Sequence, residues 1–301
     1  MTMSMALAED LWPAVCLEEV LGVDQPTNSP DDVDREDLPY VEYLWSDLKA
    51  RRAALNLRQE DLAAVFGMTL QRYRTYESGG RSETAPAGLI SELMAMEAFV
   101  AGQAHTMVEQ AHPEGTVVLH AVVDDLEFGA SYPDACTRRD RVQYPITLQH
   151  VAVGRAAAEL TRRDRDVVVL RGERRFDMAA ARLACGLGKN EAAYLLDLNE
   201  KTYYRAERGT RDPLEKSMVE LQEIDDFIDM VAGELDISTD NAGAMTISIY
   251  DGQAAFEKAY PQAVVERSGN PYPVNVLWVA AGRCAGQLAA TGQPARVVVR
   301  N

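Results

Sequence analysis

Apolar residues along the chain follow two spacings in alternating stretches. Spacings of three and four mark two groups of predicted helices, at residues 40–55, 58–66, 69–77 and 84–109 and at residues 178–186, 189–196, 199–207 and 213–234. After each group the spacing changes to two, over residues 116–123 and 245–250, which predicts a strand. Helices followed by short strands predict a mostly helical α+β fold.

The segment after each predicted strand follows one plan. A short helix ends at a Tyr-Pro pair, at Tyr132-Pro133 in the first half of the chain and at Tyr260-Pro261 in the second. A further helix and an apolar run then close each half, at residues 151–160 and 167–170 and at residues 276–288 and 297–299. Each half is expected to hold a helical head and a small tail of the strand-helix-helix-strand kind.

The two halves share residue types at a nearly constant separation. Four residues of the first head recur as the same types 130 positions later, namely Ala63, Tyr73, Glu77 and Gly79, and the Tyr-Pro pairs recur 128 positions later. A separation held over this length predicts a tandem duplication. The expected domains are an acidic arm and linker at 1–39, a first module at 40–172 and a second module at 173–301, with a charged connector near residues 171–175.

The net charge of −17 is concentrated at one end of the chain. Residues 1–47 hold twelve acidic residues and one basic residue, whereas the other 254 residues hold 35 acidic and 29 basic ones. An acidic arm on a nearly neutral body does not exclude nucleic acid as a partner. The arm is either a solvated tail or, over residues 5–22, a helix that docks on a partner protein or on the body.

Several other classes of protein are disfavoured. No apolar run approaches the length of a membrane span, and the first residues carry acids where a secretory signal carries bases. The cysteines Cys16, Cys136, Cys185 and Cys284 lie far apart, which indicates reduced thiols in a cytoplasm and no structural zinc. Motifs of hydrolases, metalloproteases and nucleotide-binding enzymes are absent. We therefore expect no membrane partner, no cofactor and no enzyme activity.

Residues 57–79 combine the features of a helix-turn-helix. Two short helices are joined by a turn at Gly67, Thr69 can cap the second helix, and Gly79 can end it. This motif places its second helix in the major groove of DNA. The segment LRQEDLAAVFGMTLQRYRTYESG resembles the Cro/C1-type (XRE) family of regulators, and the resemblance implies that Gln59 contacts a DNA phosphate.

Helical spacing separates buried from outward positions in the first head. The buried set is Leu62, Phe66, Met68, Tyr73 and Tyr76. The set predicted to contact DNA is Arg58, Gln59, Thr69, Leu70, Gln71, Arg72 and Arg74. A glutamine reads adenine and an arginine reads guanine, each worth roughly 1–3 kcal/mol of discrimination. Further bases are expected to neutralise phosphates, namely Lys49, Arg51, Arg52 and Arg81. The alternative is that all of these residues form only a solvated face.

The second head has a weaker basic surface. Residues 178–212 carry one more base than acids, against an excess of four in residues 48–82. Its buried set is Ala192, Leu196, Leu198, Tyr203 and Ala206, and its candidates for DNA contact are Lys189, Glu200, Lys201, Thr202, Tyr204 and Arg205. Lys189 stands where Gln59 stands in the first head, and Glu200 would face phosphates or cytosine. This head either binds DNA or has become a structural or protein-contacting unit.

The tails narrow the expected function. The segments SIYDGQAAFEKAYPQAV and PVNVLWVAAGRCAGQLAATG resemble the YdiL-like module of anti-CRISPR-associated repressors, in which the tail dimerises the protein. The chain is thus expected to be a bacterial or phage repressor that binds a double-stranded DNA operator as a single-chain pseudo-dimer. A homodimer, or a protein partner of the acidic arm, stays open. The alternative function is a protein-interaction module, antitoxin-like or DNA-mimicking, that uses the arm and residues 215–240.

Overall fold

The first predicted head forms three short helices at the expected places. In a computed structural model, which describes residues 41–79, 84–239 and 244–300, these are α1 (Trp45–Ala54), α2 (Gln59–Val65) and α3 (Leu70–Glu77). Thr69 caps α3 as predicted, because its hydroxyl accepts the backbone N–H of Arg72 at 3.3 Å. The longer α4 (Ala87–Glu109) follows. The acidic arm lies outside the described residues.

The second group of predicted helices also forms. It comprises α7 (Asp177–Ala184), α8 (Lys189–Leu195), α9 (Glu200–Glu207) and the longer α10 (Glu215–Glu234). Asn199 caps α9, because its side-chain oxygen accepts the backbone N–H of Lys201 at 3.0 Å. Both caps sit one residue before the helix that each head presents outward.

Each tail contains a parallel strand pair joined through two helices. The first tail holds β1 (Val117–Ala121), α5 (Asp125–Ser131), α6 (Thr147–Arg162) and β2 (Val167–Arg171). The second tail holds β5 (Met245–Tyr250), α11 (Gln253–Ala259), α12 (Asn275–Ala290) and β6 (Ala295–Arg300). β1 pairs with β2 and β5 pairs with β6, both in parallel. The intervening helices supply the crossover that a parallel pair requires.

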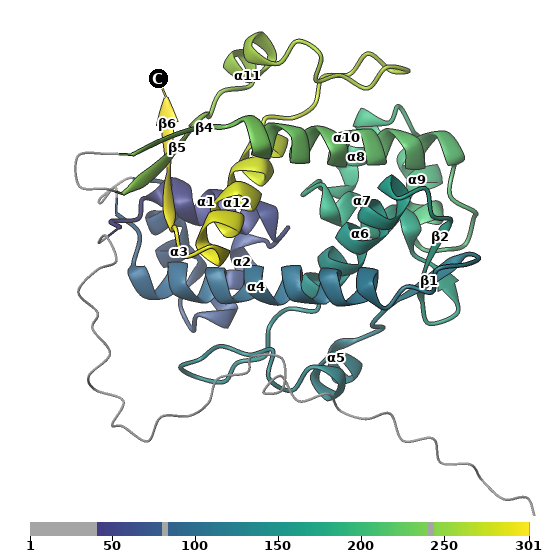
Figure 1. Ribbon diagram of the computed structural model, residues 1–301, viewed down its shortest axis with the longest axis horizontal. Helices are drawn as coiled ribbons and strands as arrows, with labels where there is room; N and C mark the ends of the chain where they lie inside the picture. Colours follow the sequence, from purple (N-terminus) through teal and green to yellow (C-terminus); the bar gives the residue numbers. More distant parts are fainter. Residues whose placement is uncertain (1–40, 80–83, 240–243, 301) are drawn as a thin grey trace, which may run out of the picture. The chain divides into compact units, whose positions relative to one another are not determined.

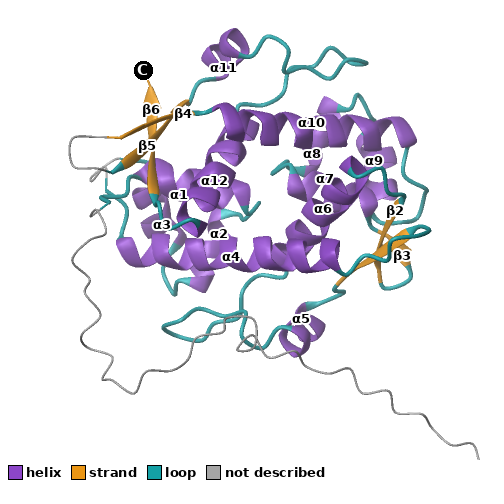
Figure 2. Ribbon diagram, viewed as in Figure 1, coloured by secondary structure: helices purple, strands orange, loops and turns teal. Residues whose placement is uncertain are grey.

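Two short strands were not predicted. β3 (Arg174–Arg175) pairs antiparallel with β2, and β4 (Asp236–Thr239) pairs antiparallel with β5. The charged connector expected near residues 171–175 takes the form of a hairpin on the first sheet. All four residues of β4 are exposed, so the segment lacks the alternation that marks a half-buried strand. The two sheets lie on opposite sides of the helices (Figure 2).

The helices pack across the two halves of the chain. α1 packs on α12, and α7 packs on α6, so the head of each half contacts the tail of the other. Glycines make both approaches close. A Cβ on Gly154 would lie 2.2 Å from the carbonyl oxygen of Ala180, and one on Gly282 would lie 2.3 Å from that of Ala50. Residues from Pro39 to the C-terminus accordingly form one compact unit.

A buried carboxylate fixes α1 to the opposite tail. The side chain of Asp47 accepts the backbone N–H of Leu44 at 2.7 Å, which caps α1, and that of Val297 in β6 at 2.7 Å. Burial raises the pKa of Asp47 to about 7, although both hydrogen bonds oppose this shift. In the other head, Asp177 accepts the N–H of Val169 in β2 at 2.9 Å. The first helix of each head is thus anchored to a strand of the other half.

Candidate nucleic-acid interface

The first head has the compact turn of a helix-turn-helix. Gly67 adopts a φ of +60°, a conformation that favours glycine, and the N–H of Met68 donates to the carbonyl of Ala63 at 2.9 Å. Leu62 and Tyr73 are fully buried between the helices. The predicted core of both heads is confirmed, with Phe66, Met68, Tyr76 and Leu198 half-buried against it.

The outward face of α3 is polar and carries no acid. Gln71, Arg72 and Arg74 are exposed. The Nε of Arg74 donates to the side-chain oxygen of Gln59 at 3.2 Å and its guanidinium lies 3.4 Å from Glu60. The structure thus brings together Gln59 and Arg74, which lie on successive helices. Exposed contacts of this kind are weak, at about 0.2–1 kcal/mol, so a DNA phosphate or base can replace them.

Two further candidates flank this face. Arg58 has a side chain that is 76% exposed and pairs with Asp61 at 2.8 Å. Thr69 is exposed, with its hydroxyl engaged as the cap. The prediction that Leu70 points outward is corrected, because its side chain is half-buried and packs on the core of the same head. The polar face therefore begins at Gln71.

Three bases that were predicted to neutralise phosphates have other roles. Arg51 is fully buried and pairs with Glu97 on α4. Lys49 pairs with Asp251 at 2.6 Å and lies over the ring of Trp278, 4.0 Å from its centre. Arg52 pairs with the buried Glu77. The spacing of α1 did not reveal these roles because the partners belong to other parts of the chain. Arg81 lies outside the described residues.

An arginine–glutamate brace orients the outward helix in both heads. Arg52 on α1 pairs with Glu77 at the end of α3 and also donates to the carbonyl of Leu57 at 3.0 Å. Arg182 on α7 pairs with Glu207 at the end of α9 at 2.5 Å and donates to the carbonyl of Leu187 at 2.6 Å. Both glutamates are buried. Each brace therefore holds the last turn of the outward helix against the first helix of its head.

The outward helix of the second head offers a mixed surface. Glu200, Lys201 and Arg205 are exposed, and Thr202 is half-buried. Tyr204 is half-buried, packs on the core and donates its hydroxyl to Asn190. Lys189 is exposed and its amine lies 3.6 Å from Glu207. Thr202 and Tyr204, both predicted to contact DNA, are therefore only partly exposed.

A basic cleft beside α9 was missed at the sequence level. It has a volume of about 860 Å³, and the cations that line it include Arg171, Arg174, Arg175, Lys189 and Arg208. Arg174 and Arg208 are exposed. The run RGERR at residues 171–175 was the available signal, but only the β2–β3 hairpin brings it next to the second head. The cleft can attract phosphates.

The two outward helices are well separated. α3 and α9 lie on opposite sides of the view in Figure 1, with α12 and α6 between them. They are therefore not packed on each other, and both keep exposed polar side chains.

The comparison with protein families agrees with this geometry. A helix-turn-helix family model matches residues 48–90, which run from α1 into the first turn of α4. The match supports the expected helix-turn-helix of the Cro/C1 type at this place, and this class of domain indicates a DNA-binding transcription regulator. Neither the curated proteins nor the solved structures give a match to the chain.

Other kinds of site were sought among the described residues. None of the helices formed by these residues is long and apolar enough to cross a membrane. Within the same part of the chain, no group of three or more His, Cys, Asp or Glu side chains is placed to hold a metal ion.

Proposed function

We propose that the protein is a sequence-specific repressor that binds operator DNA through α3 and α9 of one chain. The observation that carries this proposal is the exposed ridge of Gln71, Arg72 and Arg74 on a capped helix, inside the segment that matches the helix-turn-helix family. Amide and guanidinium groups at such positions can read base edges in the major groove. Binding would occlude a promoter in the cytoplasm, and neither a cofactor nor catalysis is part of the proposal.

Reciprocal contacts support a tandem duplication. Arg155 on α6 donates to the carbonyl of Ala54 at the end of α1, at 2.7 Å, and Arg283 on α12 donates to that of Ala184 at the end of α7, at 2.8 Å. Each half makes this contact between its own tail and its own head, and between the halves α1 packs on α12 as α7 packs on α6, a matched arrangement like that of two subunits across a two-fold interface. The proposed pseudo-dimer replaces the association of two chains by an intramolecular contact.

Three acidic residues of α10 favour this proposal over a DNA mimic. Asp225 pairs with Arg283 at 2.5 Å, Asp226 pairs with Arg162 at 2.8 Å, and Glu220 pairs with Arg267 at 2.7 Å. A mimic of DNA must present its carboxylates to the partner. These carboxylates are instead neutralised by arginines of the chain itself.

The proposal is tested by titrating the full chain into labelled random-sequence duplexes at two salt concentrations. A DNA binder loses affinity as salt rises, with a logarithmic slope of about −0.9 for each phosphate neutralised. We expect measurable binding at low salt and a steep loss at high salt. Absence of binding to any duplex at low salt would contradict the proposal.

A further inference from the structure

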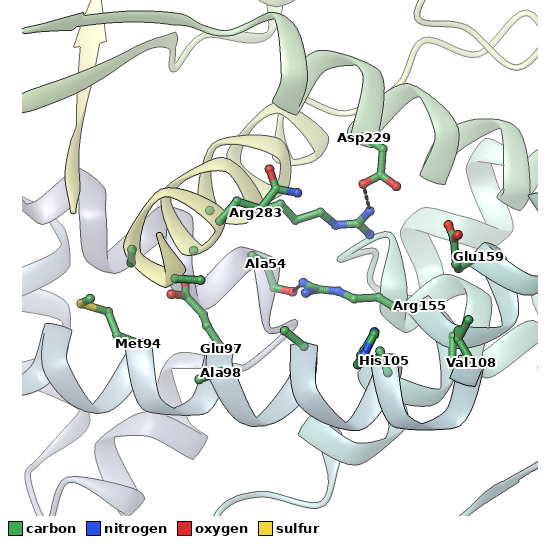
Figure 3. A pocket seen from close by; sticks show the side chains of 18 of the residues that line it. Ala54, Met94, Glu97, Ala98, His105, Val108, Arg155, Glu159, Asp229 and Arg283 are labelled. Atoms are coloured by element: carbon green, nitrogen blue, oxygen red, sulfur yellow. Dashed lines mark hydrogen bonds and ion pairs between the residues drawn. The ribbon is translucent and has the colours of Figure 1, made fainter. Parts of the chain in front are cut away.

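A pocket lies between the long helices that separate the two heads. Its walls come from α4, α6, α10 and α12, and its volume is about 690 Å³ (Figure 3). Small apolar side chains form much of the lining, including Ala95, Ala98, Ala101, Ala289 and Ala290. Two arginines enter it from facing helices, Arg155 from α6 and Arg283 from α12. The pocket therefore joins an apolar body to a charged end, where these arginines lie near the carboxylates of Glu97, Asp225 and Asp229.

The two arginines occupy matching places but have different partners. Both donate to the last carbonyl of a head's first helix. Arg283 also pairs with Asp225 and Asp229, both at 2.5 Å. Within the described part of the chain, no carboxylate forms an ion pair with Arg155, and the buried Nε atoms of both arginines have no hydrogen-bond partner. One guanidinium is thus neutralised twice and the other is not.

The register of the helices explains this difference. Phe99 meets Phe128 and Tyr132 edge-on, and 128 residues later Phe227 meets Phe256 and Tyr260 in the same way. In this register Asp225 corresponds to Glu97, and Asp229 corresponds to Ala101. Glu97 pairs with Arg51 instead of Arg155, and Ala101 has no carboxylate. The first half therefore forms no ion pair with its arginine, whereas the second half forms two.

The unpaired guanidinium is held in an unfavourable environment. Burial, and after it the positive charge of Arg283, lower the pKa of Arg155 to about 10, although the nearby carboxylates of Asp225, Asp229 and Glu97 oppose this shift. The side chain nevertheless stays protonated at neutral pH. A partly buried charge without a counter-ion is costly, so an anion that enters the pocket would relieve this cost.

We propose that the pocket binds a small organic carboxylate with an apolar body. The carboxylate would pair with Arg155 in the way that Asp229 pairs with Arg283, and the alanines would contact the apolar part. Ala98 and Ala101 are exposed at the open side of the pocket, which gives such a ligand a route inward. The open space is large enough for an aromatic or short aliphatic acid.

The test measures thermal unfolding of the full chain with butyrate, benzoate and 4-phenylbutyrate, each against its neutral amide. A ligand of the native state raises the midpoint, so at least one acid should raise it well beyond its amide. Titration calorimetry then gives the affinity of the best acid. Arg155→Gln should weaken that affinity by about 30-fold or more, because a buried charge loses its partner. The matched control Arg138→Gln, at the exposed rim of the same pocket, should change it little.

A second variant guards against misfolding of the first. Ala101→Asp places a carboxylate where the second half has Asp229, at an exposed position that tolerates a larger side chain. It should abolish the response to the acids and stabilise the ligand-free chain. Acids that act no better than their amides, or an undiminished response in both variants, would overturn the proposal. So would no response to any acid, the result expected if a carboxylate of the chain itself or of a second copy already fills the pocket.

Discussion

The two heads share a scaffold and differ in the surface that they present. In both, a side-chain cap starts the outward helix and a buried arginine–glutamate brace holds its end. α3 then exposes Gln71, Arg72 and Arg74, whereas α9 exposes Glu200 beside Lys201 and Arg205. An acid at the start of an outward helix opposes phosphates, so the scaffold alone does not define a reading surface.

The surroundings of the outward helix are more basic in the second head than in the first. The basic cleft lies beside α9, and three of the cations expected around α3 are engaged inside the protein. We infer from the proposed function that the first head reads bases and that the second contributes mainly backbone contacts. Four changes sharpen or break this comparison.

The largest expected effect is a pH dependence carried by the first head. The pKa of Asp47 is raised to about 7 by burial, whereas an unfolded aspartate titrates near ~3.9. Between these values the native state holds a proton that the unfolded state has lost. The free energy of unfolding should therefore fall as pH rises from about 4 to about 7, by up to about 4 kcal/mol, and stay lower above that window.

Asp47→Asn isolates this contribution. Urea unfolding of both chains across the pH range should show a slope for the natural chain that the variant lacks. If the free energy of unfolding depends on pH in the same way in both chains, Asp47 is not the source of the pH dependence.

The braces should be nearly as important to stability. Glu77→Ala leaves the guanidinium of Arg52 without its carboxylate, which costs about 3 kcal/mol. Glu207→Ala should cost more, because Glu207 also accepts the hydroxyl of Tyr203 at 3.1 Å. Urea unfolding measures both, with the exposed Glu60→Ala as the control. A loss no larger than that of the control would show that the braces are dispensable.

Because each head packs on the tail of the other half, two glycines at these contacts should be equally sensitive to substitution. Gly154→Ala and Gly282→Ala each drive a methyl group into a backbone carbonyl of the opposite half, at a cost of about 2 kcal/mol. Gly102→Ala is the matched control, because a Cβ there meets nothing within 4 Å, and it should stabilise α4 by about 0.5–1 kcal/mol. The midpoints of thermal unfolding, measured by calorimetry, test this prediction. Tolerance of both Gly154→Ala and Gly282→Ala would rule out this packing.

The smallest effect concerns sequence discrimination. Arg74→Ala should reduce the ratio of affinities for specific and random duplexes by about 1–3 kcal/mol, and Arg205→Ala should reduce it less. Arg174→Ala, in the basic cleft, should leave the ratio intact and lower the salt slope by about one. Anisotropy titrations give all three values. A larger loss of discrimination with Arg205→Ala would assign base reading to the second head.

Local elements could be predicted from the sequence, and long-range partners could not. The cap Thr69, the helical spacing and the Tyr-Pro ends placed most helices within a few residues of their observed bounds. All residues of β4 are exposed, so this strand lacks the alternation of buried and exposed positions by which a strand is predicted. In the sequence Arg51 is typical of a base on the protein surface. Its partner Glu97 comes close to it only in the folded chain.

The relation between the two halves was also beyond the sequence. Repeated residues predict similar elements, but they do not say that each head packs on the tail of the other half. Gly154 and Gly282 allow that approach, and many glycines in helices serve no such purpose. The pocket between the halves follows from this packing and was not predicted either.

The central claim is that α3 enters a groove of duplex DNA and that α9 contacts the same duplex. Selection of bound oligonucleotides from a random pool tests it most directly. The account predicts enrichment of a two-part consensus, with one strong and one weak half. A chain that carries both Gln71→Ala and Arg74→Ala should no longer select the bases of the strong half, and it should still select the weak half. A pool that shows no enrichment, or an unchanged consensus with the variant, would contradict it.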